Sequence, residues 1–305
     1  MARVFAVGDA NVDVFCLPER LPSLGEEAHG EIHASIGGNA ANFAAALGRL
    51  GGAVELVSVS GADPFSHFIR SELSKSGVSL NLAESSQPSG ISLITLNRKG
   101  ERSIVSSKGA CAELTTALLE SRLLPHLRRG DVVYIGGFFH LPNMHRGFAS
   151  LLKRARIKGS VIMLDLCFDE YGLWMKSLKP IIKLIDVLFM DALELWKLTG
   201  EKDMLKAIKK LQEAGAGEIV LKLGKSGSAY FFGKKFFHSK APKTRCVNST
   251  GAGDVFDAGF VLGRMKGLDA GTCLRLGNMA AAEKVRHHGI VVPSRAAVDR
   301  LLGTF

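Results

Sequence analysis

The sequence predicts an α/β fold with a doubly wound, mostly parallel central sheet, flanking helices and a small β lid. Short apolar runs that are typical of strands alternate with helical patterns for most of the 305 residues. This alternation implies a mostly parallel sheet that is covered on both faces. At two places, strand pairs occur with no helix between them, and these pairs are the basis for the lid.

The elements of the predicted core follow one another along the chain. Strands are expected at residues 4–7, 54–59, 131–135, 161–164, 187–190 and 219–223. Helices are expected at residues 40–50, 64–76, 144–158 and 204–214, and a further helix begins at Leu193. Ligands of such folds bind beyond the carboxyl ends of the strands, so the site is expected at that edge of the sheet.

The two strand pairs comprise residues 11–17 with 28–35, and residues 90–97 with 101–107. A short connection, Arg98-Lys99-Gly100, joins the second pair. The pairs are either extra edge strands or a lid that closes over a substrate, and nearby glycine-rich turns favour the lid. The predicted division is therefore an α/β core of residues 1–10, 36–88 and 108–305, and a lid of residues 11–35 and 89–107.

The composition restricts the partners and the location. The chain has 39 basic and 29 acidic residues, and this net charge of +10 suits phosphorylated ligands. The basic residues form no long tract and no recognised module, so no nucleic-acid partner is expected. Five scattered cysteines without a C-x-x-C pair argue against disulfides and structural zinc. No apolar run reaches the ~18–20 residues of a membrane span, and no signal peptide is evident, so a cytoplasmic location is expected.

The most informative stretch is NSTGAGDVF, residues 248–256, which predicts a loop that opens a helix. Gly251 and Gly253 let backbone N–H groups turn toward one point. The helix start adds unpaired amides and a positive dipole end, a combination that binds phosphate. Asp254 would repel a phosphate, but it makes sense as a base that takes a proton from an attacking hydroxyl. The other interpretation is an ordinary helix start with an acidic first turn.

Two stretches near the N-terminus could bind a polyhydroxylated ligand. Asn11, Asp13 and Phe15 share one face of an extended segment, and Asp13 can accept two hydrogen bonds from neighbouring hydroxyls. Asp13 could equally be an Asx-turn residue. The stretch GGNAAN, residues 37–42, opens the first helix and allows close approach of a ligand, although many helices begin in this way.

Two later stretches are candidates for a nucleotide site and a metal site. Residues 222–227, KLGKSG, form a tight turn that could contact nucleotide phosphates or simply join two strands. They are no P-loop, because that motif needs a glycine where Ile219 stands. Asp191 and Glu194 lie on one helix face and could bind Mg²⁺ through water, or could be the acidic first turn of a solvated helix.

Together, these stretches resemble the ribokinase-like (PfkB-type) family of carbohydrate and nucleoside kinases over nearly the whole chain. Residues 249–256 are similar to the C-terminal signature of the family, and residues 37–42 to its N-terminal signature. The resemblance implies that a hydroxymethyl group attacks the γ-phosphoryl of ATP, with Mg²⁺ as the metal. It implies the following roles: Asp254 as catalytic base; Gly251, Ala252 and Gly253 as anion hole; Asn11, Asp13, Gly37, Gly38, Asn39 and Asn42 around the acceptor; Lys222, Gly224, Gly227 and Asn278 around the nucleotide; Asp191 and Glu194 around the metal.

The chain departs from the family pattern at several positions. Asp191 stands where asparagine is usual, and Lys222 where threonine is frequent. Residues 165–169 lack an arginine that is often found there in sugar kinases. Asn248 replaces a common aspartate at the family's monovalent-cation site, which leaves the binding of such a cation open.

The first hypothesis is therefore an ATP-dependent kinase of a free sugar. A nucleoside kinase is the alternative, because Phe15, Phe138 and Phe139 could form an apolar wall for a base. A sugar-binding regulator without activity is a third hypothesis, and the intact Asp254 argues against it. Whether ATP or ADP is the donor stays open. A homodimer through the lid is expected, because unpaired strand edges associate readily.

Overall fold

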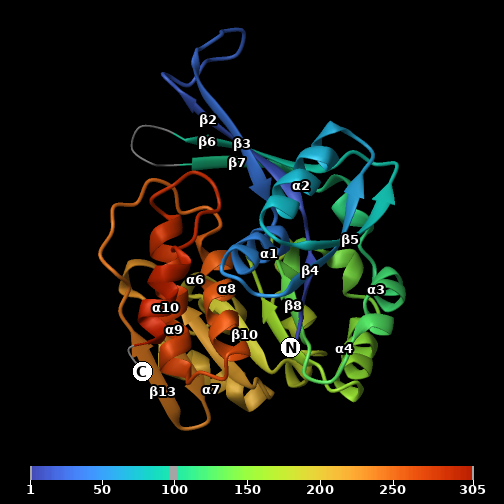
Figure 1. Ribbon diagram of the computed structural model, residues 1–305, viewed down its shortest axis with the longest axis vertical. Helices are drawn as coiled ribbons and strands as arrows, with labels where there is room; N and C mark the ends of the chain where they lie inside the picture. The colour runs from blue at the N-terminus through green and yellow to red at the C-terminus, as the bar shows by residue number, and fades with distance from the viewer. Residues whose placement is uncertain (1, 97–101, 304–305) are drawn as a thin grey trace.

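The computed structural model describes residues 2–96 and 102–303 and contains a central sheet of nine strands (Figure 1). The strand order is β13-β12-β11-β10-β9-β8-β1-β4-β5. Neighbours from β11 to β5 pair in parallel, whereas β12 and β13 form an antiparallel edge. The strands of this sheet are β1 (Val4–Gly8), β4 (Val54–Gly61), β5 (Ser79–Ser85), β8 (Val132–Gly136), β9 (Val161–Asp165), β10 (Val187–Asp191), β11 (Glu218–Lys222), β12 (Ser228–Phe232) and β13 (Lys235–Ser239).

Helices cover both faces of the sheet and enclose two apolar cores. Alternate residues of β1 point in opposite directions, so Phe5 and Val7 enter one core while Val4 and Ala6 enter the other. The first core lies under α3 (Thr116–Arg122), α4 (Phe148–Ile157), α5 (Met175–Leu178), α6 (Ala192–Thr199) and α7 (Met204–Ala214). The second lies under α1 (Asn39–Arg49), α2 (Pro64–Lys75), α8 (Ala252–Met265), α9 (Ala270–Lys284) and α10 (Arg295–Leu302).

A second sheet stands apart from the central one, at the top of Figure 1. Its four strands are β2 (Asn11–Pro18), β3 (Gly30–Gly37), β6 (Gly90–Leu96) and β7 (Arg102–Ser107), in the order β3-β2-β6-β7. The pairs β2–β3 and β6–β7 are antiparallel, and a parallel pairing of β2 with β6 joins them. The separate small lid sheet is therefore confirmed, and the edge-strand interpretation is wrong; closure of the lid over a substrate stays a prediction. The predicted connection at residues 98–100 lies outside the described residues.

The predicted core strands and helices are confirmed with small shifts at their ends, and the fold class is confirmed with them. One helix begins later than expected: residues 142–144 form a separate 3-10 turn, and Gly147, at φ +80°, precedes the first turn of α4. The strands β5, β12 and β13 and the helices α3, α5, α9 and α10 were not predicted.

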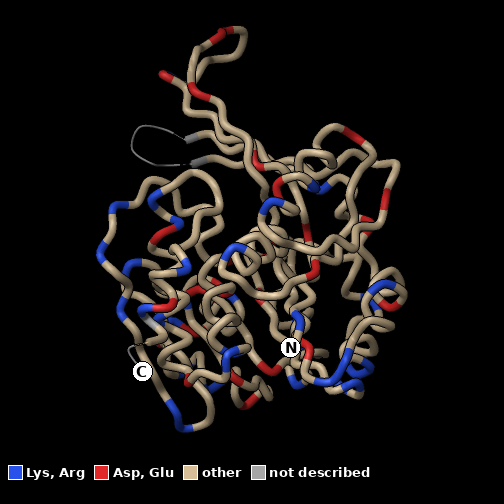
Figure 2. The backbone as a smooth tube through the Cα atoms, viewed as in Figure 1, with Lys and Arg blue, Asp and Glu red and all other residues tan. Residues whose placement is uncertain are grey.

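Basic and acidic residues are interspersed over the body of the molecule (Figure 2). Within residues 2–96 and 102–303, no helix is long and apolar enough to cross a membrane.

Candidate active site

Two pockets meet at the N-terminus of α8, beyond the carboxyl ends of the central strands. The first, which we call the lid pocket, has a volume of ≈ 300 Å³ and lies between the lid and the core. The second, which we call the α9 pocket, has a volume of ≈ 470 Å³ and lies between α8, α9 and the turn after β11. Asp254 lines the lid pocket, whereas Ala252 and Gly253 line the α9 pocket. The first turn of α8 is thus the wall that the two pockets share.

Asp254 is held in place by two amides from the first turn of α1. Asn39 Nδ2 donates to Asp254 Oδ1 at 3.0 Å, and Asn42 Nδ2 donates to Asp254 Oδ2 at 3.0 Å. The side chain is only 4% exposed. Burial and the nearby carboxylate of Asp165 raise the pKa of Asp254 to about 8, against the opposing effects of Lys222 and the two amides. The geometry therefore gives an oriented carboxyl group with a pKa near neutrality.

The N-terminus of α8 has no side-chain cap. Gly251 precedes the helix in a left-handed conformation, at φ +77°, and a Cβ there would lie 3.2 Å from Asn42 Nδ2. The first amides of a helix lack intrahelical acceptors, and the helix dipole adds positive potential. The α6, α7 and α9 helices, in contrast, begin with aspartates whose side chains accept from their own first turns. The start of α8 therefore suits an external anion.

A lysine and several carboxyl groups lie behind this helix start. Lys222 Nζ donates to Asp165 Oδ1 at 2.6 Å and to Asp257 Oδ2 at 3.3 Å. The hydroxyl of Tyr134 donates to Asp257 Oδ2 at 2.9 Å. Burial alone would lower the pKa of Lys222, but Asp165 and Asp257 outweigh it and hold that pKa well above its usual value. Lys222 is therefore a paired cation, and a Cβ added to Gly253 would lie 3.2 Å from its Nζ.

The lid supplies a second carboxyl group to the lid pocket. Asp13 on β2 is 7% exposed, and its backbone pairs with Ser92 on β6. Burial, and then the nearby Asp9, raise the pKa of Asp13 to about 7, while a hydrogen bond with Ser92 opposes this rise. Gly37 on β3 makes room for it, since a Cβ there would lie 2.0 Å from Asp13 Oδ1.

Asp9 fixes the other side of the lid pocket. Its Oδ1 accepts from the Asn39 backbone amide at 2.8 Å, and its Oδ2 accepts from Asn11 Nδ2 at 3.3 Å. Asn11, Gly38, Asn39 and Asn42 all line the lid pocket with Asp13 and Asp254. The structure therefore brings together the acceptor-side residues that were expected from two distant stretches of the sequence, and places Gly37 behind Asp13.

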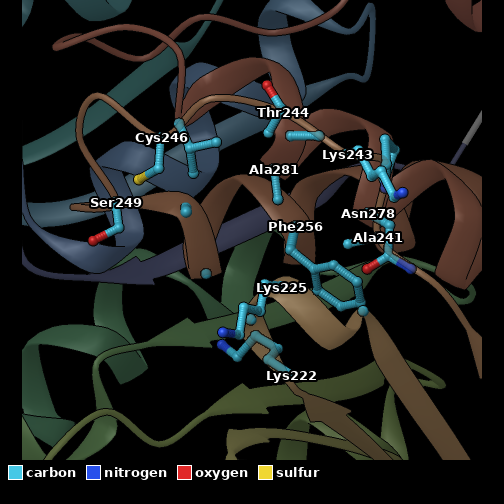
Figure 3. Close-up of a pocket in the computed structure, with 17 residues that line it drawn as sticks. Lys222, Lys225, Ala241, Lys243, Thr244, Cys246, Ser249, Phe256, Asn278 and Ala281 are labelled. Carbon is cyan, nitrogen blue, oxygen red and sulfur yellow. The ribbon is translucent and has the colours of Figure 1, made fainter.

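The α9 pocket has a different lining, made largely of glycines, alanines and aliphatic groups with lysines at its sides (Figure 3). Lys222, Gly224, Gly227 and Asn278 all line it, as expected of a common site. Asn278 Nδ2 donates to the Ser239 carbonyl at 3.0 Å, which ties α9 to the end of β13. Phe256 also points into the pocket.

Asp191 and Glu194 form a capping box at the start of α6. Asp191 Oδ1 accepts from the Glu194 amide at 2.8 Å, and Glu194 Oε2 accepts from the Asp191 amide at 2.8 Å. Burial, and then the carboxylate of Asp165, raise the pKa of Glu194 to about 8. Within the described ranges, no group of three His, Cys, Asp or Glu side chains is placed to hold a metal. These two residues therefore offer no ready-made inner coordination sphere.

Comparison with known proteins identifies the family of this chain. The profile of the pfkB family carbohydrate kinases matches residues 1–297. The chain belongs to this family. It is therefore a carbohydrate kinase, an ATP-binding transferase.

Two curated relatives of this carbohydrate kinase differ in the sugar that they are named for. A ribokinase of Arabidopsis thaliana is 28% identical over an alignment of 311 residues that covers 97% of this chain and 80% of the relative. A fructokinase of Escherichia coli is 28% identical over an alignment of 276 residues that covers 86% of this chain and 84% of the relative.

Solved structures share the fold over nearly the full length. Ribokinase of Arabidopsis thaliana complexed with ribose and ATP has a TM-score of 0.84 at 27% identity, and 99% of each chain is covered. A ribokinase II of E. coli in complex with ATP and Mg²⁺ has a TM-score of 0.86 at 20% identity, with 100% of each chain covered. The second likeness concerns the fold alone.

Several site residues of the kinase were not singled out from the sequence. Asp165 is the last residue of β9 and lies at the edge of the sheet where ligands are expected. Because ligands of parallel sheets bind beyond the carboxyl ends of the strands, this residue could have been identified from the sequence. Asp257 follows Asp254 by three positions on α8 and hence lies on the same helix face. Ser92 is identified only by its register opposite Asp13, which requires knowledge of the β2–β6 pairing.

Proposed function

We propose that this protein transfers the γ-phosphoryl group of ATP to the hydroxymethyl group of a free sugar. The sugar occupies the lid pocket and the nucleotide occupies the α9 pocket. One observation carries the proposal: Asp254 faces the lid pocket from the same helical turn whose Ala252 and Gly253 face the α9 pocket. A hydroxyl beside Asp254 and a phosphate beside Gly253 would therefore be neighbours.

The reaction follows from this placement. Asp254 takes the proton from the sugar hydroxyl, and the oxygen forms a bond to the γ-phosphorus as the bond to the β-phosphate oxygen breaks. ADP leaves, and the proton stays on Asp254 until solvent accepts it. The amides of Gly251, Ala252 and Gly253 offset the negative charge that is being transferred. A carboxyl group with a pKa of about 8 is a suitable base for this step near neutral pH.

Lys222 and the metal site serve the nucleotide side. The Lys222 ammonium interacts electrostatically with Asp165, Asp257 and Glu194. Three carboxyl groups thus lie around one positively charged side chain. This donor set fits Mg²⁺ bound through water, the mode that the ion prefers. Asp191 and Glu194 would arrange the waters of the ion, and the ion would offset the charge of the phosphates. Lys222, Gly224, Gly227 and Asn278 would contact the nucleotide.

The lining of the lid pocket supports a sugar over a nucleoside. The side chains there are carboxyls, amides, hydroxyls, one lysine, the imidazole of His140 and the thiol of Cys111, with the aliphatic Ile94, Ile104 and Leu141. Phe15, Phe138 and Phe139, the candidates for a wall against a base under the nucleoside alternative, are at most 2% exposed and do not line this pocket. A lining of polar side chains without Phe, Tyr or Trp suits vicinal hydroxyls.

Formation of ADP across a panel of pentoses, hexoses, sugar acids and nucleosides tests the proposal. We expect turnover with at least one free sugar, and a kcat/KM for that sugar at least tenfold above that for any nucleoside. A preference for nucleosides would replace the sugar assignment. Binding of sugars without any ADP formation would instead indicate a regulator without activity.

A homodimer and a cytoplasmic location complete the proposal. β3 and β7 are the free edges of the lid sheet, and Ile32 on β3 and Val105 on β7 are exposed. Pairing of such edges between two copies would remove apolar surface from water. Sedimentation that gives a mass near 32.7 kDa at all concentrations would contradict the dimer.

A further inference from the structure

Lys284, the last residue of α9, is the buried cation for which the proposed reaction has no use. It is 0% exposed. Its Nζ donates to the backbone carbonyl of Asn248 at 3.2 Å and to that of His287 at 3.2 Å. In the described part of the chain it forms no ion pair with a carboxylate. Carbonyl oxygens that converge on a buried positive charge are the donor type that binds simple cations in proteins.

The two carbonyls belong to segments that hold the anion loop in place. The amides of Val247 and Asn248 both donate to the Val285 carbonyl, at 2.7 and 3.0 Å. Asn248 Oδ1 accepts from the Thr250 amide at 2.9 Å, immediately before Gly251. The segment after α9 is thus tied to the loop that leads into α8, and the Lys284 ammonium lies between them.

The position of Asn248 also belongs to the monovalent-cation site that the family resemblance implies. A free cation does not fit there in this chain, because the carbonyl of Asn248 already receives the Lys284 ammonium. Burial lowers the pKa of Lys284 to about 8, and Cys246, Asp13 and Asp254 oppose this shift. The positive charge of Lys284 therefore interacts favourably with the carboxyl groups of Asp13 and Asp254 in the lid pocket.

We propose that the Lys284 ammonium is a built-in cation that replaces a free monovalent ion and positions the anion loop of residues 248–253. This inference rests on the proposed function, which gives the loop its role of binding the transferred phosphoryl group. The position of the built-in cation rests on the hydrogen bonds of Lys284 to the two carbonyls. It makes Lys284 a positioning residue. It also implies that the kinase works without added potassium.

The test compares the wild-type protein with Lys284→Ala, with the exposed Lys153→Ala on α4 as a matched control. Turnover and melting temperature are measured in potassium, ammonium and tetramethylammonium chloride at equal ionic strength, and melting is measured without substrates. We expect wild-type turnover to change less than about twofold between these salts. We expect Lys284→Ala to lose about 10- to 100-fold in kcat in tetramethylammonium, because the loop is misplaced.

The decisive result is rescue. Potassium or ammonium should restore most of the turnover of Lys284→Ala and raise its melting temperature, with no such effect on the wild type or Lys153→Ala. A wild-type enzyme that needs potassium for a tenfold gain would overturn the inference, even if the variant failed to fold. A folded, impaired variant that no cation rescues would also overturn it, since Lys284 would then only close the helix end. If no acceptor is found, the melting series still decides whether the site binds cations, separately from the proposed reaction.

Discussion

The two pockets on either side of the first turn of α8 are built from different kinds of group. The lid pocket presents the side chains of Asp13, Asn11 and Asp254, which come from β2 and α8. The α9 pocket presents backbone, small residues and apolar surface, with Lys222 and Asn278 among its polar side chains. Under the proposed function, the difference teaches that recognition of the acceptor would depend on individual side chains, whereas recognition of the donor would depend largely on the course of the backbone. Side-chain substitutions should therefore separate the two functions.

The largest effect is expected at the boundary between the pockets. Asp254→Asn keeps the shape of the side chain but removes the base, so kcat should fall by ~10²–10⁴. Binding of both substrates, measured by calorimetry, should be largely kept, because neither pocket loses its other contacts. Asp299→Asn on α10 is the control, since Asp299 is exposed and does not line either pocket. Full activity of Asp254→Asn would remove this residue from the chemistry.

The next effect is that of pH on the lid pocket. The pKa of Asp254 is raised to about 8, so its carboxyl is neutral below that pH and cannot accept a proton. Asp13, with its pKa raised to about 7, acts in the same direction. We expect kcat/KM to rise with pH up to about 8 and then to level, with a loss of roughly tenfold per unit between pH 8 and 7 and a steeper loss below about 7, where Asp13 is also neutral. A flat profile between pH 5.5 and 8.5 would contradict the assignment of a buried base.

A smaller effect, confined to the acceptor, is expected at the lid. Asp13→Asn removes a charged acceptor of hydrogen bonds, each worth about 1.5–3 kcal/mol when lost, so kcat/KM for the sugar should fall about 10- to 100-fold. The KM for ATP should change less than twofold. The reciprocal variant is Asn278→Ala in the α9 pocket, which should affect the KM for ATP alone. If either variant changed the kinetic constants for the sugar and for ATP equally, the proposed division of roles between the two pockets would be contradicted.

The smallest effect is expected at the start of α6. Asp191→Ala removes one half of the capping box and should lower the free energy of unfolding by ~0.5–2 kcal/mol. Asp203→Ala removes the corresponding cap of α7 and is the matched control. Denaturant titration should show similar losses for both variants. Only Asp191→Ala should raise the Mg²⁺ concentration that gives half-maximal activity; if Asp203→Ala does the same, Asp191 has no role beyond capping.

The sequence predicted those parts of the site that short local motifs encode. The glycines and Asp254 of residues 248–256, and the asparagines of residues 37–42, carry conformational and chemical signals within a few positions. The structure adds that the two motifs meet, through Asn39 and Asn42 on Asp254. The four-stranded lid was also predictable, because its strand pairs lack crossover helices.

Other parts depend on pairings between distant segments and could not be predicted in this way. In the sequence, Lys284 looks like any basic residue at the end of a helix. Only its hydrogen bonds to the carbonyls of Asn248 and His287 distinguish it. The sequence predicts that Lys222 is a phosphate ligand at a turn. Its hydrogen bonds to Asp165 and Asp257 depend on the order of β9, β10 and β11 in the sheet, which the sequence does not give directly. Isolated polar residues acquire such roles only through tertiary contacts.

Phosphorus NMR of the reaction mixture tests the central claim most directly, because it identifies both products. With ATP, Mg²⁺ and the preferred sugar, ADP and a phosphomonoester should appear in equal amounts, and the ester phosphorus should couple to the two protons of a methylene group. ADP with inorganic phosphate in place of the ester, or an ester on a ring hydroxyl with coupling to a single proton, would contradict transfer to a hydroxymethyl group beside Asp254.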